Sequence, residues 1–81
     1  MDLSEQPPEL HESIIQVAKE WCQLYFKQQS VQIREVVEIA TPYPNEVFGF
    51  RVIVVMPDHP QGEAIDVVIE PNNTMYVVYV P

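Results

Sequence analysis

The sequence of 81 residues is poor in several residue types, with one cysteine, two glycines and four Lys and Arg residues against twelve Asp and Glu residues. One cysteine excludes an internal disulfide and a metal site built from cysteines. Two glycines leave no material for a phosphate-binding loop, and no hydrolase or metalloprotease motif is present, so we expect no cofactor. A formal charge of −8 argues against direct binding to nucleic acid or to anionic membranes.

Long apolar runs are also missing. No stretch reaches the length of about 18 apolar residues that a membrane span needs. The first five residues include Asp2 and Glu5 and no basic residue, whereas a signal peptide begins with a basic segment. We therefore expect a cytoplasmic protein. The chain length allows one domain, 1–81, and a hydrophobic content of 47% with 20% charged residues is typical of a globular fold rather than a disordered chain.

Residues 8–28 have the period of an amphipathic helix. Apolar side chains recur at spacings of four and three residues, at Leu10, Ile14, Val17, Trp21 and Leu24. The preceding Pro-Pro pair suits a helix start, because proline is favoured at the first helical position. The apolar arc covers about 200° of the helix surface. This is wider than packing on one sheet needs, so the helix flank is a candidate contact surface.

Beyond Ser30 the apolar period changes to two, which predicts strands at about 31–40, 47–56, 63–70 and 75–80. The breaks between them are too short for parallel crossovers. The predicted fold is α+β, with an N-terminal tail (1–7), one helix (8–28) and a four-stranded antiparallel meander (31–80) of order 1-2-3-4, the helix lying across one face. This arrangement resembles the cystatin-like one in outline, although no motif of that group is present.

Alternation along each strand assigns side chains to the two faces of the predicted sheet. The face toward the helix is expected to hold Val31, Ile33, Val37, Ile39, Phe48, Phe50, Val52, Val54, Met56, Ile65, Val67 and Ile69. Glu35 interrupts the first row, which predicts either a bulge between Glu35 and Val36 or an inward charge on an edge strand.

Two registers are open for the last strand. A loop of two or four residues turns Tyr76, Val78 and Val80 inward. A three-residue loop with a bulge turns Met75, Val77 and Tyr79 inward instead. The alternation pattern does not choose between them, because both rows are apolar.

The opposite face of the predicted sheet is unusually apolar, and contiguous apolar patches on a soluble protein mark interfaces. The loop at 41–46 holds an aromatic residue between two prolines, which predicts either a rigid recognition element or an ordinary stiffened turn with Tyr43 folded onto the core. Together these features predict eight binding residues: Val36, Tyr43, Pro44, Asn45, Val47, Ile53, Val55 and Val68. The alternative interpretation is that the N-terminal tail covers this face, or that scattered valines are tolerated there.

Few residues are candidates for chemistry. His11 and His59 are predicted at opposite ends of the fold, about 30 Å apart. Asp58, His59 and Glu63 share a loop, but their spacing matches no tight metal site, and we interpret them as a proline-flanked acidic turn. Cys22 is expected to be a buried hydrophobic residue in the middle of the helix. We therefore assign no metal ligands and no catalytic residues.

The sequence thus predicts a small acidic interaction protein without enzymatic chemistry. It is expected to bind a protein partner, or to form a homodimer, through the second sheet face or the helix flank. One alternative is an acidic decoy that occupies the groove of a basic partner, which requires carboxylates in rows. Another is a small hydrolase or isomerase that uses Glu35 or His11 in a pocket between helix and sheet.

Overall fold

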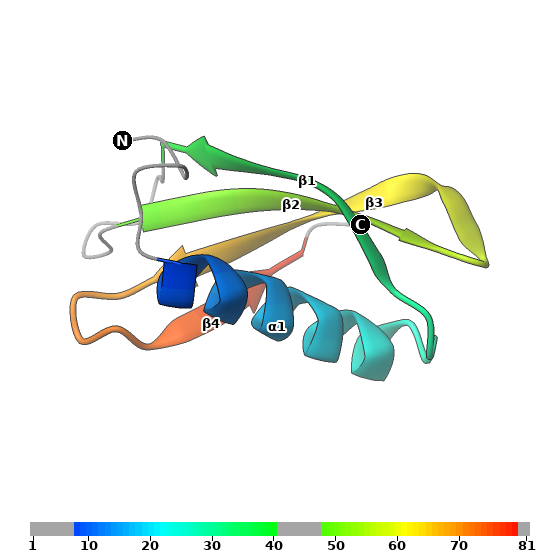
Figure 1. Ribbon diagram of the computed structural model, residues 1–81, viewed down its shortest axis with the longest axis horizontal. Coiled ribbons are helices and arrows are strands. Elements are labelled where there is room, and N and C mark those ends of the chain that lie inside the picture. Colours follow the sequence, from blue (N-terminus) through cyan, green and yellow to red (C-terminus); the bar gives the residue numbers. More distant parts are fainter. Residues whose placement is uncertain (1–7, 41–47, 80–81) are drawn as a thin grey trace.

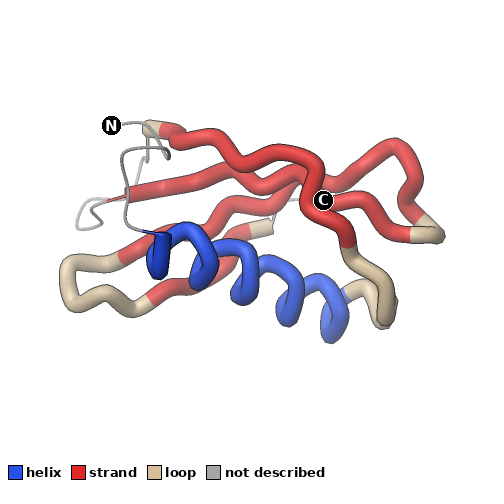
Figure 2. Tube along the Cα trace, in the orientation of Figure 1, coloured by secondary structure: helices blue, strands red, loops and turns tan. Residues whose placement is uncertain are grey.

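The computed structural model describes residues 8–40 and 48–79, and these have the predicted α+β architecture. The elements are α1 (Pro8–Tyr25), β1 (Gln32–Ile39), β2 (Phe48–Met56), β3 (His59–Ile69) and β4 (Met75–Val78). All neighbouring strands are antiparallel, in the order β1-β2-β3-β4. Figures 1 and 2 show two layers, with α1 lying in front of the β3 and β4 side of the sheet. The described part of the chain holds no helix long and apolar enough to cross a membrane.

The helix starts where the sequence predicts and ends at Tyr25, before the predicted Gln28. The Phe26 N–H still donates to the Cys22 carbonyl oxygen at 2.9 Å. Lys27 then takes a left-handed backbone conformation, with φ of 56°. A left-handed residue directly after the last helical hydrogen bond is a common helix terminator. The chain therefore turns toward β1 earlier than the apolar pattern indicates.

The core lies between α1 and the two central strands. The helix contributes one fully buried side chain per turn, at Ile14, Ala18 and Cys22. The sheet contributes Val31, Phe50, Val52, Val54, Met56, Ile65, Val67 and Ile69. Full burial of each larger apolar side chain stabilises the fold by about 1.5–3 kcal/mol, so this cluster is the main source of stability.

The predicted bulge in β1 is present, but it precedes the expected position. The pairing with β2 shifts between Ile33 and Glu35. Beyond this point Val36 pairs with Val52, whose side chain is buried under the helix. Because directly paired antiparallel residues share a face, Val36 lies on the helix side of the sheet. Its predicted place on the opposite face was wrong, because the alternation was counted through the extra residue.

The same shift exchanges the following residues of β1. Glu38 pairs with Phe50 and therefore faces the helix side, where its Oε2 atom is shielded from solvent. Val37 and Ile39, which were predicted to face the helix, lie on the opposite face. Val37 is 44% exposed. A single extra residue thus moves an apolar row from the core to the surface.

The hairpin between β2 and β3 is tighter than predicted. Residues 57–58 form the turn, and β3 begins at His59 instead of Glu63. An irregularity in the pairing accommodates the extra residues before Glu63. Gly62 has φ of 97°, and a Cβ atom there would lie 3.3 Å from Ile53 Cγ2. Glycine suits this position for both reasons.

The loop between β3 and β4 selects one of the two registers left open for the last strand. The Asn73 N–H donates to the Glu70 carbonyl oxygen, and the Glu70 N–H donates to the Thr74 carbonyl oxygen, both at 2.9 Å. Asn73 has φ of 67°. This is the three-residue loop with a bulge, in which asparagine tolerates the left-handed position. The side chains placed on the helix side are therefore Met75, Val77 and Tyr79.

We expect Asn73→Val to lower the free energy of unfolding by about 1–2 kcal/mol, because a β-branched side chain is strained at positive φ. Asn73→Gly should stay within about 0.5 kcal/mol of the wild type, because glycine adopts this conformation readily. Urea unfolding followed by circular dichroism measures both. Equal losses for the two variants would contradict the assigned loop geometry.

Candidate functional site

The sheet face turned away from α1 is called the outer face below. Its members follow from the pairing, because antiparallel partners share a face. They are Gln32, Glu35, Val37, Ile39, Gly49, Arg51, Ile53, Val55, Ala64, Asp66, Val68, Tyr76 and Val78. Most of these side chains are apolar, so the predicted apolar face exists, although with a partly different membership.

The predicted binding residues divide into three groups. Ile53 and Val55 lie on the outer face and are partly exposed. Val68 also lies there, but its side chain is fully buried and offers no contact surface. Val36 lies on the helix side, as described above. Four further predicted residues, in or beside the 41–46 loop, lie outside the described residues: Tyr43, Pro44, Asn45 and Val47.

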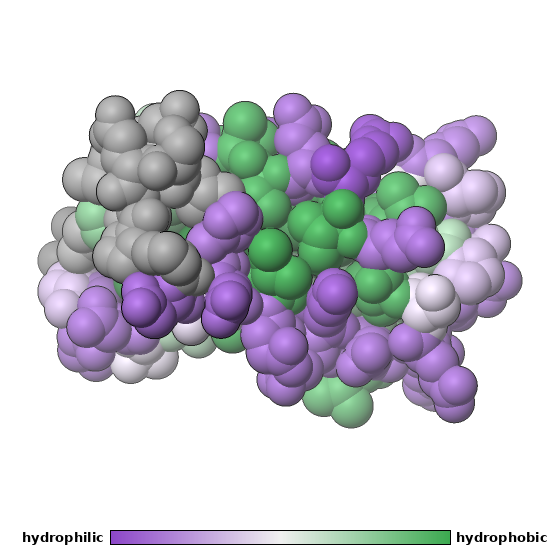
Figure 3. All heavy atoms as spheres, in the orientation of Figure 1, coloured by the Kyte–Doolittle hydropathy of each residue, from purple (hydrophilic) through white to green (hydrophobic). Residues whose placement is uncertain are grey.

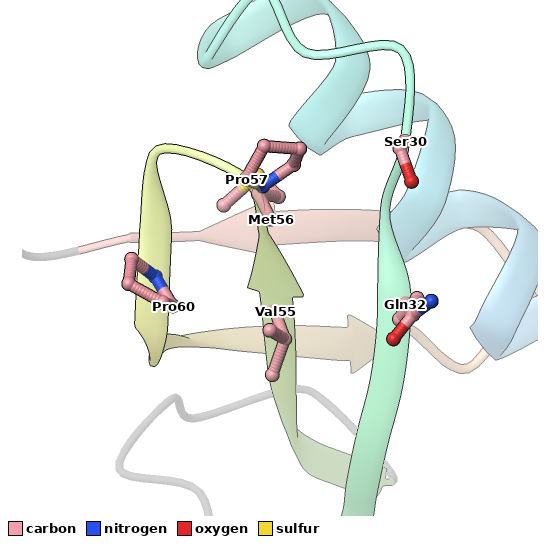
Figure 4. A pocket seen from close by; sticks show the side chains of 6 residues that line it. All are labelled: Ser30, Gln32, Val55, Met56, Pro57 and Pro60. Carbon is pink, nitrogen blue, oxygen red and sulfur yellow. The ribbon is translucent and has the colours of Figure 1, made fainter.

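A shallow hollow opens on the outer face around Val55. Its volume is about 290 Å³, and it is lined by Ser30, Gln32, Val55, Met56, Pro57 and Pro60. Figure 4 shows Val55 between Gln32 on β1 and Pro60 on β3. The two prolines and the valine make its lining largely apolar, and the proline rings hold their shape. The hollow is suited to an apolar side chain from outside.

The charges of the outer face are nearly balanced. Arg51 donates from Nε and Nη2 to the two carboxylate oxygens of Asp66, at 2.9 and 3.3 Å. This hydrogen bonding raises the pKa of Arg51. Arg34 reaches across the outer face, with Nη1 donating to the Gln61 carbonyl oxygen at 3.4 Å, and Glu35 lies beside it in sequence. Arg34 and Arg51 offset Glu35 and Asp66, and Glu70, two positions beyond Val68 at the end of β3, adds one negative charge at the margin of this face.

A second apolar area lies on the helix side. Figure 3 shows apolar side chains gathered between α1 and β1, where the helix does not cover the sheet. Ile33 and Val36 of β1 are partly buried and pack against the core from this side. Glu38 lies on the same strand face. On the helix itself, Leu24 is 81% exposed and Tyr25 is 53% exposed, so the predicted helix flank is also an exposed apolar surface.

Pairing of β3 and β4 assembles a polar cluster of His59, Glu63 and Tyr79 at the C-terminal end of α1. His59 Nδ1 lies 3.1 Å from Glu63 Oε1, and the Tyr79 hydroxyl donates to Glu63 Oε2 at 3.1 Å. The ring of Phe26 packs on the imidazole, with centroids 4.9 Å apart. Trp21 packs on the Tyr79 ring, at a centroid distance of 5.6 Å. The cluster therefore connects the helix end to both strands.

Sequence reasoning identified only part of this polar cluster. His59 and Glu63 were interpreted as turn residues, because they were assigned to a loop. Tyr79 was missed, because it meets Glu63 only when β4 takes the register set by Asn73. The available signal was the spacing of four residues between His59 and Glu63, which brings the two together across the irregular start of β3.

Within the polar cluster, Glu63 fixes the positions of the His59 and Tyr79 side chains. Glu63 anchors both neighbours, which holds the imidazole in one orientation. The nearby Cys22 thiol is buried, and burial followed by the charge of Glu63 raises the pKa of Cys22 to about 11. A reactive cysteine requires the opposite shift. Among residues 8–40 and 48–79 no group of three or more His, Cys, Asp or Glu side chains is arranged to hold a metal ion.

The two residues considered for hydrolase or isomerase chemistry are not brought together. His11 is exposed on α1, and Glu35 is exposed on the outer face. The chain matches no model of a known protein family, no curated protein and no solved structure.

We expect the free energy of unfolding to fall by about 2–3 kcal/mol as the pH rises through the interval from 9 to 11, because the folded state resists ionisation of Cys22. A group whose pKa is raised by folding contributes its full stability at pH values below its pKa in the unfolded chain. This contribution is lost as the pH rises through its pKa in the folded protein. The pKa of Tyr79 is also raised, mainly by desolvation and then by its bond to Glu63, so it acts in the same direction.

Urea unfolding at pH 8, 9, 10 and 11 tests this expectation, with Cys22→Ala as the matched variant. The variant should lose markedly less stability across the alkaline range, whatever its stability at pH 8. An identical pH profile for the two proteins would show that the thiol is not responsible.

Proposed function

We propose that this chain is a small acidic cytoplasmic protein that acts by self-association, forming a homodimer through the outer face of its sheet. The observation that supports the proposal is the combination of apolar character and charge balance on that face. The chain as a whole carries −8, whereas Arg34 and Arg51 balance Glu35 and Asp66 on the outer face. Two copies meet there with the least like-charge repulsion.

The helix side is less suited to a second copy. No Lys or Arg lies among the helix-facing residues of the described strands, whereas Glu38 and Glu63 do. Like charges opposed across an interface cost several kcal/mol. A dimer formed at the apolar area between α1 and β1 would bring these carboxylates toward those of the partner copy.

The dimensions of the outer face indicate a reversible dimer. The four strands hold 8, 9, 11 and 4 residues. At a rise of about 3.3 Å per residue and a spacing of about 4.8 Å, they give a face on the order of 500 Å². Stable complexes bury about 800 Å² per partner, and transient ones bury less. We therefore expect the dimer population to depend on protein concentration.

The helix flank is the alternative surface for self-association, because Leu24 is the most exposed large apolar side chain described. An acidic decoy has less support. The carboxylates of the described residues are spread over α1, both sheet faces and two turns, and do not form a row with the spacing of phosphates.

We expect Val55→Lys to weaken self-association at least tenfold, because it places a charge in the apolar hollow of the outer face. Light scattering on a size-exclusion column, over a tenfold range of concentration, should show the wild type approaching twice the chain mass and the variant staying near the monomer mass. Circular dichroism should show that the variant is folded, because Val55 is only partly buried.

Leu24→Lys is the matched control, since it adds the same charge to the helix flank. It should leave the dimer unchanged. Both variants lower the net negative charge, so a loss of dimer only in Val55→Lys cannot come from overall repulsion. Retained association in Val55→Lys, or loss of association in Leu24→Lys, would contradict the outer face as the interface.

A further inference from the structure

Resting on the proposed homodimer, we infer the register in which two copies meet. Val37 of each copy inserts into the hollow around Val55 of the other copy, and Arg34 of each copy pairs with Glu35 of the other. The inference comes from the order of these features along the outer face of β1.

A protruding side chain and one wall of a receiving hollow lie on the same strand, β1. Val37 is 44% exposed on the outer face of β1. Gln32, five positions earlier on the same strand, forms one wall of the hollow around Val55. At about 3.3 Å per residue the two features are about 16 Å apart along β1. The outer face therefore carries both halves of a self-complementary contact.

A two-fold axis makes such a contact reciprocal, because residue i of one copy then touches residue j of the other, and residue j touches residue i. For Val37 to reach the hollow of the second copy, the axis must cross the outer face midway between Val37 and that hollow. The midpoint lies beside β1, at the level of Arg34 and Glu35. Arg34 and Glu35 of one copy therefore lie opposite Glu35 and Arg34 of the other copy.

The charges at the midpoint suit this arrangement. Arg34 and Glu35 are both exposed and of opposite sign. The hydrogen bond of Arg34 to the Gln61 carbonyl oxygen is long, at 3.4 Å, so its guanidinium has donors left for a carboxylate. Arg51, in contrast, is already bound to both carboxylate oxygens of Asp66. A reciprocal pair of Arg34–Glu35 bridges thus uses the charges that are available.

Pairing of β1 edges from two copies is a different arrangement of the same strand. The bulge between Ile33 and Glu35 interrupts the regular ladder, and charged side chains flank it. Bulges and charges on an edge strand oppose edge-to-edge pairing. The face-to-face register avoids this obstacle, because it uses side chains and not the free backbone groups of β1.

Charge reversal tests the register. Arg34→Glu and Glu35→Arg should each weaken dimerisation at least tenfold, because each opposes like charges across the axis. The double variant, Arg34→Glu with Glu35→Arg, should return the dissociation constant to within about threefold of the wild type. Lys19→Glu on α1 is the control with the same charge change as Arg34→Glu, and it should have little effect. Failure of the double variant to recover would overturn the register.

Cross-linking gives an independent test in the folded protein. A Val37→Cys chain mixed with a Gln32→Cys chain should form a mixed disulfide dimer under mild oxidation, and Cys22 does not compete because it is buried. Preferential 37–37 or 32–32 cross-links would place the axis elsewhere and overturn the inference. The homodimer itself is tested by Val55→Lys, whereas charge reversal and cross-linking test the register. A wrong register can therefore be distinguished from the absence of a dimer.

Discussion

The packing of one buried helix stripe against the central strands is the contact on which the rest of the structure depends. Ile14, Ala18 and Cys22 are fully buried against a sheet whose two central strands supply most of the core. A helix has one stripe to bury, whereas a sheet has two faces. Once α1 lies on one face, no described element covers the other. The partly exposed apolar residues of the outer face follow from this imbalance.

Much of the architecture could be predicted from local patterns. The change of apolar period after the helix, and the short proline- and asparagine-containing breaks, were sufficient for the helix, the four strands and their order. The faces of β1 could not be predicted, because a bulge adds one residue and reverses every later side chain. Val36 and Val37 therefore exchanged places. Periodicity does not reveal a bulge that precedes the visible interruption at Glu35.

The candidate site could also be predicted only in part from the sequence. Ile53 and Val55 lie on the outer face as predicted, because the extra residues of the irregular pairing beside Val55 belong to β3 and leave the alternation of β2 intact. The cluster of His59, Glu63 and Tyr79 could not be predicted, because it depends on how β3 begins and on the register of β4. That register follows from Asn73, whose left-handed conformation closes the loop. The contact between Tyr79 and Glu63 thus depends on the conformation of one turn residue, Asn73.

The two faces of the sheet differ in charge, and only one of them is covered by the helix. On the helix side, Glu63 binds Tyr79 and lies beside His59, next to a thiol that burial keeps protonated. On the outer face Arg34 and Arg51 offset Glu35 and Asp66, and Val37, Ile53 and Val55 stay at least partly exposed. In a chain of net charge −8, the outer face is thus the surface on which the proposed second copy would meet the least like charge.

The most direct test of the outer face as a homodimer interface is an isotope-filtered NMR experiment on a mixture of methyl-labelled and unlabelled chains. If two copies meet through the outer face, we expect intermolecular contacts from the methyl groups of Val37, Ile53 and Val55, and none from Leu24. Intermolecular contacts from Leu24 alone, or none from any methyl group at millimolar concentration, would contradict it.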